Sequence, residues 1–303
     1  MNVSRRTLSF RTILVLSLIA IPTGVQSLQA QDKTSPPVTF TYSKPINYPG
    51  STYTEVFAIN DSEEIVGTYG TNFQLQNGFQ EQNNVFTTDN CVLTNETLMS
   101  DVNNKGEIVG SYAGNDNGNI EGFIWDGNGQ CQTIADPNGP ATTDVWGVND
   151  NGVLVGFYTD SASNFQGFEW VNGTFTTITC PNWTNTRAYG INDAGIIVGD
   201  NANAPPSFSG FALASGKCIP VNYPNAVSTS AKGINKSDVI AGWYIDASGM
   251  THGFVESGGK FQALNYPGAI ATLAFHINDK DQVAGWYEDS ARVIHGFVAT
   301  PKK

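Results

Sequence analysis

The chain has 303 residues, of which 32 are glycine and only 14% are charged. Leu, Lys and Glu never cluster, so the composition is typical of a turn-rich β protein. The formal net charge of −12 disfavours binding to nucleic acid and to anionic membrane surfaces, and neither is expected as a partner.

Residues 1–30 have the features of a signal peptide. Arg5, Arg6 and Arg11 form a basic region, and residues 12–25 form an apolar stretch that is too short to span a bilayer comfortably. The Arg-Arg pair also resembles a twin-arginine signal, so the general secretory and twin-arginine routes both stay open, with an uncleaved anchor as the alternative to cleavage. We expect a secreted or periplasmic bacterial protein without stable membrane insertion. Removing residues 1–30 takes away three arginines and no carboxylate, which leaves 12 basic and 27 acidic residues and a net charge of −15.

Six copies of one repeat occupy residues 39–300, after a linker at 31–38 and before a tail at 301–303. Each copy contains an Ile-Asn or Val-Asn pair, a glycine seven residues after the asparagine, and then a Gly-Phe pair. The asparagines are Asn60, Asn103, Asn149, Asn192, Asn235 and Asn278, spaced by 43 residues except for one step of 46. The Gly-Phe pair recurs with the same period, and two independent markers that share a period indicate a true repeat.

Each copy predicts four short strands that are rich in β-branched and aromatic residues. In the last copy the first three strands are residues 272–277, 282–287 and 294–299, and the fourth type of strand precedes them at 260–266. The repeated asparagine lies in the turn between the first and second strands. Its side chain can cap the turn, and a glycine that often follows accepts a positive φ, so the six asparagines are interpreted as turn residues rather than as ligands.

The two ends of the repeat region are complementary. The region ends on a third strand, while residues 39–49 contain Tyr48-Pro49, which matches Tyr266-Pro267 of a fourth strand. We therefore predict an all-β fold, a six-bladed β-propeller of four-stranded antiparallel blades whose ring is closed by the N-terminal strand. A stacked β-solenoid is the alternative, and the protein is expected to be a monomer.

The repeat pattern resembles a known family. The order Ile-Asn-x-x-Gly-x-Ile-Val-Gly-x-Tyr, Gly-Phe and Tyr-Pro-Gly is similar to that of the bacterial extracellular HAF-repeat family, over residues 39–300. This resemblance implies an exported propeller-like protein and brings no established activity. The fourth copy departs from the pattern, because Asp200 and Asn201 replace the usual aromatic pair after Gly199.

The four cysteines fall at two phases of the repeat. Cys131 and Cys218 stand at the first position of a fourth strand, and Cys91 and Cys180 stand five residues after that position. Since the twisted outer strands run nearly around the rim, the end of one lies near the start of the next. We predict the disulfides Cys91–Cys131 and Cys180–Cys218 between blades, with free buried thiols as the alternative. No Cys-x-x-Cys pair supports a zinc site.

The loops between the second and third strands vary most, as recognition loops do. In the fifth and sixth copies an aromatic pair is followed by an acidic residue and a histidine. The candidate ligand-binding residues are Trp243, Tyr244, Asp246, His252, Trp286, Tyr287, Glu288, Arg292 and His295. Flat rings beside carboxylates and donors suit a sugar. Packing between blades for the aromatic residues and a polar cap for the histidines are the alternatives.

No hydrolase elbow, P-loop or dinucleotide motif is present, and no catalytic residue, metal site or cofactor is predicted. We predict an exported recognition module for polysaccharide or another cell-surface ligand. One alternative is a secreted propeller enzyme, a polysaccharide lyase or hydrolase that uses His252, His276 or His295 with Arg292. The other is a structural cell-surface interaction protein.

Overall fold

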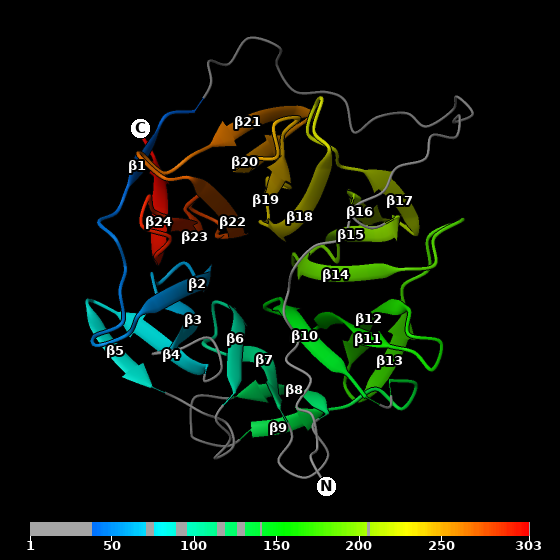
Figure 1. The fold of residues 1–303 in the computed structure, drawn as a ribbon. Helices are drawn as coiled ribbons and strands as arrows, with labels where there is room; N and C mark the ends of the chain where they lie inside the picture. Colours follow the sequence, from blue (N-terminus) through cyan, green and yellow to red (C-terminus); the bar gives the residue numbers. More distant parts are fainter. Residues whose placement is uncertain are drawn as a thin grey trace, which may run out of the picture.

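The computed structural model describes residues 38–70, 76–88, 96–113, 119–125, 131–139, 141–204 and 207–302. These residues form twenty-four strands in six four-stranded antiparallel sheets, which are arranged as blades around a central axis (Figure 1). The predicted six-bladed propeller is confirmed. The predicted signal peptide lies outside the described residues. Within the described ranges no helix is long and apolar enough to cross a membrane.

In blades one to five, four consecutive strands run from the axis to the rim. Blade one comprises β2 (Tyr53–Ile59), β3 (Ile65–Gly70), β4 (Asn77–Gln82) and β5 (Val85–Thr88). Blade two comprises β6 (Thr97–Val102), β7 (Ile108–Ala113), β8 (Ile120–Trp125) and β9 (Cys131–Ile134). Blade three comprises β10 (Thr143–Val148), β11 (Leu154–Thr159), β12 (Phe165–Val171) and β13 (Thr174–Thr177). Blade four comprises β14 (Thr186–Ile191), β15 (Ile197–Ala204), β16 (Ser207–Ala214) and β17 (Lys217–Pro220). Blade five comprises β18 (Ser228–Ile234), β19 (Ile240–Ile245), β20 (Thr251–Ser257) and β21 (Lys260–Leu264).

Blade six is completed by the N-terminal strand, as predicted. Its strands are β22 (Ala271–Ile277), β23 (Val283–Glu288), β24 (Ile294–Pro301) and β1 (Phe40–Tyr42). β1 pairs antiparallel with β24, Thr41 lying opposite Thr300, and the two ends of the described chain lie side by side in Figure 1. This pairing closes the ring and excludes the open solenoid.

The Gly-Phe motif fills each blade through a close backbone approach. The six motif phenylalanines, which include Phe79, are fully buried. Phe79 pairs with Gly67 on the neighbouring strand, and a β-bulge between Val56 and Ala58 in β2 brings the carbonyl of Glu55 against the same glycine. A Cβ atom at Gly67 would lie 2.0 Å from that carbonyl oxygen and 2.9 Å from the phenylalanine ring. The glycine is therefore required by the bulge and the ring together.

The repeated asparagines cap the turns between first and second strands. In blade three the Asn149 Oδ1 accepts hydrogen bonds from the backbone N–H groups of Asn151 and Val153, each at 3.0 Å. Gly152 adopts a φ of 74°, and Glu63 stands at the same place in blade one with a φ of 61°. The turn role that the sequence predicts is thus observed, and glycine is not obligatory for the positive φ.

The same asparagines also link every blade to the next. Each Nδ2 donates to the backbone carbonyl of the corresponding asparagine in the following blade, over 3.0–3.2 Å. The last of these bonds runs from Asn278 to Asn60 and completes a closed circle. Local turn capping and ring closure are therefore performed by one side chain.

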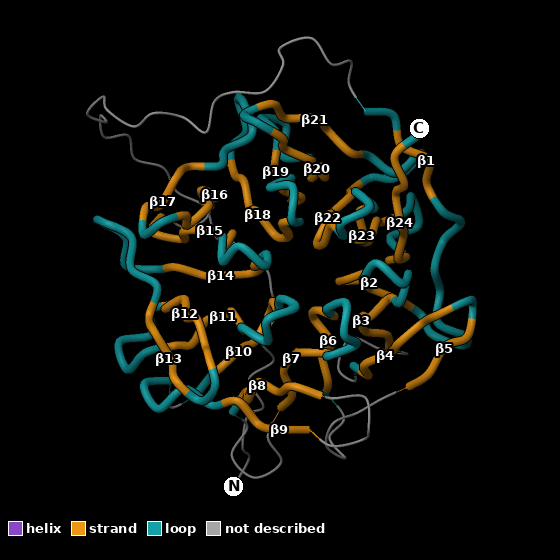
Figure 2. The backbone as a smooth tube through the Cα atoms, turned by 180° about the vertical axis from the view of Figure 1, so that it is seen from behind, coloured by secondary structure: helices purple, strands orange, loops and turns teal. Residues whose placement is uncertain are grey.

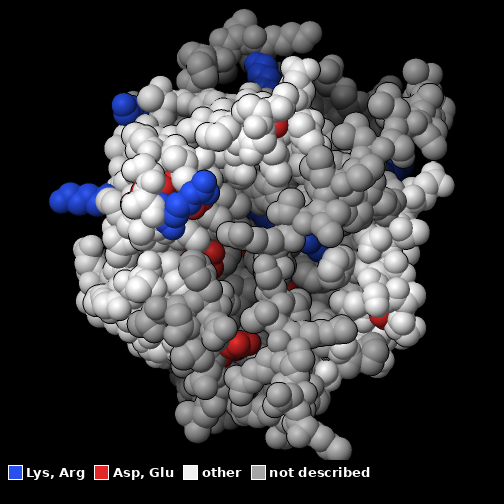
Figure 3. All heavy atoms as spheres, in the orientation of Figure 1, with Lys and Arg blue, Asp and Glu red and all other residues white. Residues whose placement is uncertain are grey.

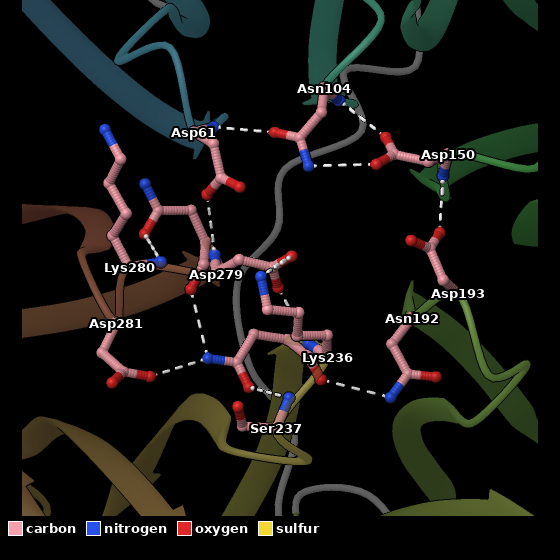
Figure 4. A network of polar contacts seen from close by, with 12 residues as sticks. Asp61, Asn104, Asp150, Asn192, Asp193, Lys236, Ser237, Asp279, Lys280 and Asp281 are labelled. Atoms are coloured by element: carbon pink, nitrogen blue, oxygen red, sulfur yellow. Dashed lines mark hydrogen bonds and ion pairs between the residues drawn. The ribbon is translucent and has the colours of Figure 1, made fainter.

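A second, more exposed circle lies on the neighbouring residues of the turns (Figure 4). There a backbone N–H of one turn donates to the side-chain oxygen of the next turn, as Asp150 does to Asp193 at 2.8 Å. The circle is interrupted after Asp193, because the equivalent residue in the turn of the next blade is Lys236, whose side chain has no acceptor. Lys236 instead forms an ion pair with Asp279 at 3.1 Å. These turns surround the axis on the face toward the viewer in Figure 2, which we call the turn face. The opposite face carries the loops between second and third strands, and we call it the loop face.

Blades are also joined at the rim. Tyr223, after β17, stacks on Tyr244 of blade five with ring centroids 3.6 Å apart, and Tyr266 stacks in the same way on Tyr287 of blade six. Between blades three and four the stacking tyrosine is replaced by Asn201, and here the predicted disulfide Cys180–Cys218 is present. Cys91 lies outside the described residues, so the Cys91–Cys131 pair stays a prediction.

Replacing Asn149 with alanine should lower the free energy of unfolding by about 1–3 kcal/mol, because two backbone donors and one carbonyl lose their partner. Chemical denaturation of the purified protein measures this change. The matched variant Asn151→Ala removes from the same turn only an exposed hydrogen bond to the Asp193 carbonyl, and it should change the free energy by no more than about 0.5 kcal/mol. Equal effects of the two variants would contradict the role given to the asparagine circle.

The double variant Cys180→Ser/Cys218→Ser should lose about 2–4 kcal/mol of stability, because the disulfide closes a loop between residues 38 positions apart. The reduced wild type should unfold at the same denaturant concentration as this variant, apart from the contribution of the second predicted disulfide. Peptide mapping under non-reducing conditions should recover Cys180 joined to Cys218. Recovery of Cys180 with any other cysteine would overturn the assignment.

Candidate functional site

The first strands of the blades line the central channel, and their two faces differ in sequence. The face turned toward the neighbouring blade has one constant position, which is threonine in all six copies, and each of these threonines is buried. These residues are Thr54, Thr97, Thr143, Thr186, Thr229 and Thr272. The hydroxyl of Thr229, for example, accepts the backbone N–H of Tyr223 in the preceding blade. Uniform positions therefore hold the ring together.

The channel-facing positions vary from blade to blade. Each first strand carries one such residue just after its threonine and a second at its β-bulge, which lies nearer the turn face. The first set is Glu55, Leu98, Asp144, Arg187, Ser230 and Leu273, and the second set is Phe57, Ser100, Trp146, Tyr189, Lys232 and Phe275. A scaffold that repeats six times has no structural need for this diversity, so these positions are the candidates for function.

The bulge residues plug the channel. Phe57 packs edge-on against Phe275 and Trp146, with ring centroids 5.0 Å and 5.9 Å away. Together the six bulge residues, with Asp101 and His276, enclose a cavity of about 10 Å³. The turn face has a second hollow of about 50 Å³ among the six asparagine turns. Both volumes are too small for a sugar ring.

Lys232 lies inside this plug among aromatic rings. Its Nζ is 3.0 Å from the ring centroid of Tyr189, and 5.4 Å and 5.6 Å from those of Trp146 and Phe275. Burial lowers the pKa of Lys232 well below its ordinary value, while the carboxylate of Asp200 acts in the opposite direction. The rings stabilise the charged form by cation–π attraction.

Arg187 and Asp200 form an ion pair nearer the loop face. The Arg187 Nε lies 2.8 Å from the Asp200 Oδ1, and the other carboxylate oxygen accepts a hydrogen bond from Ser230 at 2.7 Å. The guanidinium carbon is 4.7 Å from the centroid of Phe208 and 5.5 Å from that of Phe165. Burial acts to lower the pKa of Arg187, but the Asp200 carboxylate together with Tyr189 and Asp144 outweighs burial and raises the pKa. Asp200, a departure from the repeat pattern, is thereby explained as the partner of Arg187.

Two further carboxyl groups line the channel. Burial raises the pKa of Glu55 to about 7, although a hydrogen bond from Thr68 opposes the shift. Burial likewise raises the pKa of Asp144 to about 6, against the influence of Ser111 and of the cations Lys232 and Arg187. In Figure 3, by contrast, few charged side chains of the described residues are visible, and several of them, basic and acidic, lie together at the left edge.

The structure divides the predicted ligand residues between two faces of the blades. Trp243 and Trp286 pair across the sheet with channel-facing residues, Ser230 and Leu273, so both indoles lie on the channel side. The adjacent Tyr244 and Tyr287 point the other way and are largely covered by their stacked partners. Side chains that follow each other in a strand alternate between faces, so the two aromatic pairs do not form one continuous surface.

The two predicted histidines stand at the start of the third strands of blades five and six, at the loop face, and make equivalent contacts. His252 lies between Asn265, 2.9 Å from Nδ1, and Asp246, 3.1 Å from Nε2. His295 lies in the same way between Asn47 of the N-terminal segment and Asp289. The polar-cap interpretation describes these contacts.

The remaining predicted residues lie at the end of the second strand of blade six and in the loop that follows it, also at the loop face. Arg292 is 77% exposed and pairs with Glu288 at 3.4 Å. Within the described parts of the chain, no group of three or more His, Cys, Asp or Glu side chains is placed to hold a metal ion.

Sequence reasoning missed the channel residues Glu55, Asp144, Arg187 and Lys232. A signal for them exists in the sequence, because aligning the six copies separates the constant threonine position from the variable positions beside it. What the alignment does not give is which copies face each other across the channel.

No family model and no curated protein matches the chain. Among solved structures the chain is similar to AofleA from Arthrobotrys oligospora, at 12% identity over 90% of this chain and 89% of that chain, with a TM-score of 0.54. It is similar to SapL1 lectin in complex with alpha methyl fucoside, at 13% identity over 84% and 96%, with a TM-score of 0.54. It is also similar to the β-propeller domain of the Trilobed protease from Pyrococcus furiosus, at 9% identity over 82% and 97%, with a TM-score of 0.51. At these low identities, the structural similarity shows that the chain shares the propeller fold of these proteins.

The variant Glu55→Gln should reduce the pH dependence of stability. A carboxyl with a raised pKa binds its proton more tightly in the folded state, so its contribution falls as the pH rises from about 4.5 to about 7. Glutamine stays neutral, and the free energy of unfolding of the variant should therefore decline less across this window. Denaturation series at pH 5 and pH 8 measure the difference, with Glu169→Gln as a control for the loss of one carboxylate. An unchanged slope in Glu55→Gln would refute the burial argument.

Proposed function

We propose that the protein is an exported recognition module that binds carbohydrate at the loop face of the propeller. The observation that carries the proposal is the contrast between the constant blade-facing threonine and the variable, aromatic and charged channel-facing positions. Half-buried rings, among them Trp243, Trp286 and Phe208, offer flat apolar surfaces, and neighbouring carboxyl groups offer hydrogen-bond partners. This combination suits a sugar, which has C–H faces and hydroxyl edges.

The comparisons support the proposal through architecture. SapL1 was solved with a fucoside bound and has the same fold as this chain at low identity. The loop-face residues His252, Asp246, Glu288, Arg292 and His295 remain candidate contacts in addition to the channel residues, together with Tyr244 and Tyr287. We keep polysaccharide as the first candidate ligand and another cell-surface molecule as the second.

Export and family membership belong to the same proposal. The N-terminal features of a signal peptide and the disulfide Cys180–Cys218 both fit an oxidising compartment. The repeat pattern further supports membership of the HAF-repeat family.

A panel of soluble polysaccharides tests the proposal by calorimetry and by assay of new reducing or unsaturated ends. We expect binding without new ends. Trp243→Ala and Trp286→Ala should each weaken binding by at least about tenfold, or about 1.4 kcal/mol, because stacking on a half-buried indole is lost.

Trp170→Phe is the matched control, since Trp170 is a buried residue of β12 near the turn face. Binding that survives both channel-side tryptophan variants would contradict the proposed surface. New ends that disappear in His252→Ala or His295→Ala would instead identify an enzyme, and the absence of any response would favour a structural or protein-binding role.

A further inference from the structure

We propose that the loop-face end of the channel holds a single site for a carboxylate-bearing sugar unit, a uronic acid, and that Arg187 is its anion-binding group. This inference rests on the proposed function and names the chemical class of the ligand. It is drawn from how Arg187 is held, from what stands at the same position in the other blades, and from the charges around it.

Arg187 is fixed in place while part of its guanidinium stays available. Its Nε is used by Asp200, and the rings of Phe165 and Phe208 lie close to its guanidinium carbon. The side chain is 12% exposed, and within the described ranges its terminal nitrogens make no hydrogen bond. A guanidinium edge with two parallel N–H groups matches the two oxygens of a carboxylate, and immobilising it in advance reduces the entropy lost on binding.

The fold itself does not require this ion pair. Arg187 and Asp200 occupy paired positions on the first and second strands of blade four. The same pair of positions holds Leu273 and Trp286 in blade six, where the sheet has the same register and the same bulge. A buried ion pair adds little stability over an apolar pair of similar shape. The charges of blade four are therefore better explained by a ligand than by folding.

The surrounding charges favour an anion more strongly as the pH falls. The groups that face Arg187 are Asp200 and Tyr189 on blade four, Asp144 on blade three and Lys232 on blade five. Asp144, whose pKa is raised to about 6, competes with a ligand carboxylate for Arg187 only while it is ionised. Protonation of Asp144 removes that competitor, whereas a uronate keeps its charge in the same pH range because its carboxyl is a stronger acid.

The site is single because its residues are not repeated. Among the six copies only blade four has arginine at this position, and only blade four has aspartate opposite to it. The pair of contacts around His252 recurs around His295, so a ligand site at the histidines would occur twice in each chain. The number of ligands bound per chain therefore distinguishes a site in the channel from sites at the two histidines.

Titration calorimetry of the mature protein tests the inference with trisaccharides of galacturonate, glucuronate and mannuronate, each beside its methyl ester. The ester has nearly the same shape without the charge. We expect at least one acid to bind with one ligand per chain, to bind at least about tenfold more tightly than its ester, and to bind more tightly at pH 5.5 than at pH 7.5. The double variant Arg187→Gln/Asp200→Asn keeps a neutral hydrogen-bonding pair and should bring the ratio of acid to ester close to one.

Lys217→Gln removes one exposed positive charge from the same blade and should leave the ratio unchanged, while thermal unfolding confirms that the double variant is folded. Equal binding of every acid and its ester, retention of the preference in the double variant, or two ligands per chain would each overturn the inference. If neutral polysaccharides still bind through Trp243 and Trp286 in that case, the proposed function stands and only the uronate site fails. If nothing binds at all, both fail.

Discussion

The closed circle of asparagine side chains is the interaction on which the rest of the structure depends. One end of each side chain shapes its own turn, and the other end holds the backbone of the next blade, so a blade is fully bonded only when its neighbour is in place. The final bond, from Asn278 to Asn60, joins copies 218 residues apart in sequence. Units that are assembled from local contacts are thereby converted into one closed ring, with no repeat left to serve as an exposed end.

Because the ring is held through uniform positions, the positions that face the channel are free to differ. Thr229 binds the preceding blade in the same way as Thr54 and Thr272, whereas Lys232, three residues after Thr229 in the same strand, has no counterpart among the other bulge residues. The division between structural and variable residues therefore runs along single strands and alternates with the pleat. A search for function by loops alone overlooks it.

This alternation also explains how far the sequence could be used for prediction. The markers Asn60 and Gly67 recur with one period, and Tyr48 repeats the phase of Tyr266, so blade number, turn role and ring closure could be derived. Trp243 and Tyr244 are neighbours in the chain and were interpreted as one surface, but the pleat sends them to opposite faces. Three of the four ring contacts of Lys232 come from blades three, four and six, and no local spacing contains that information.

The ionisable groups inside the channel place a cost on the fold that is distributed unevenly around the axis, with Glu55 of blade one standing apart from the other three. Asp144, Arg187 and Lys232 belong to blades three, four and five, while the equivalent positions of blade six are leucine and phenylalanine. Burying ionisable groups is unfavourable even when they are paired, and blade six shows that the same sheet forms without them. A symmetric scaffold that keeps an asymmetric and costly interior has the organisation expected of a protein that binds one ligand in one orientation. The asymmetry of the channel, more than the propeller itself, is therefore the strongest argument for recognition.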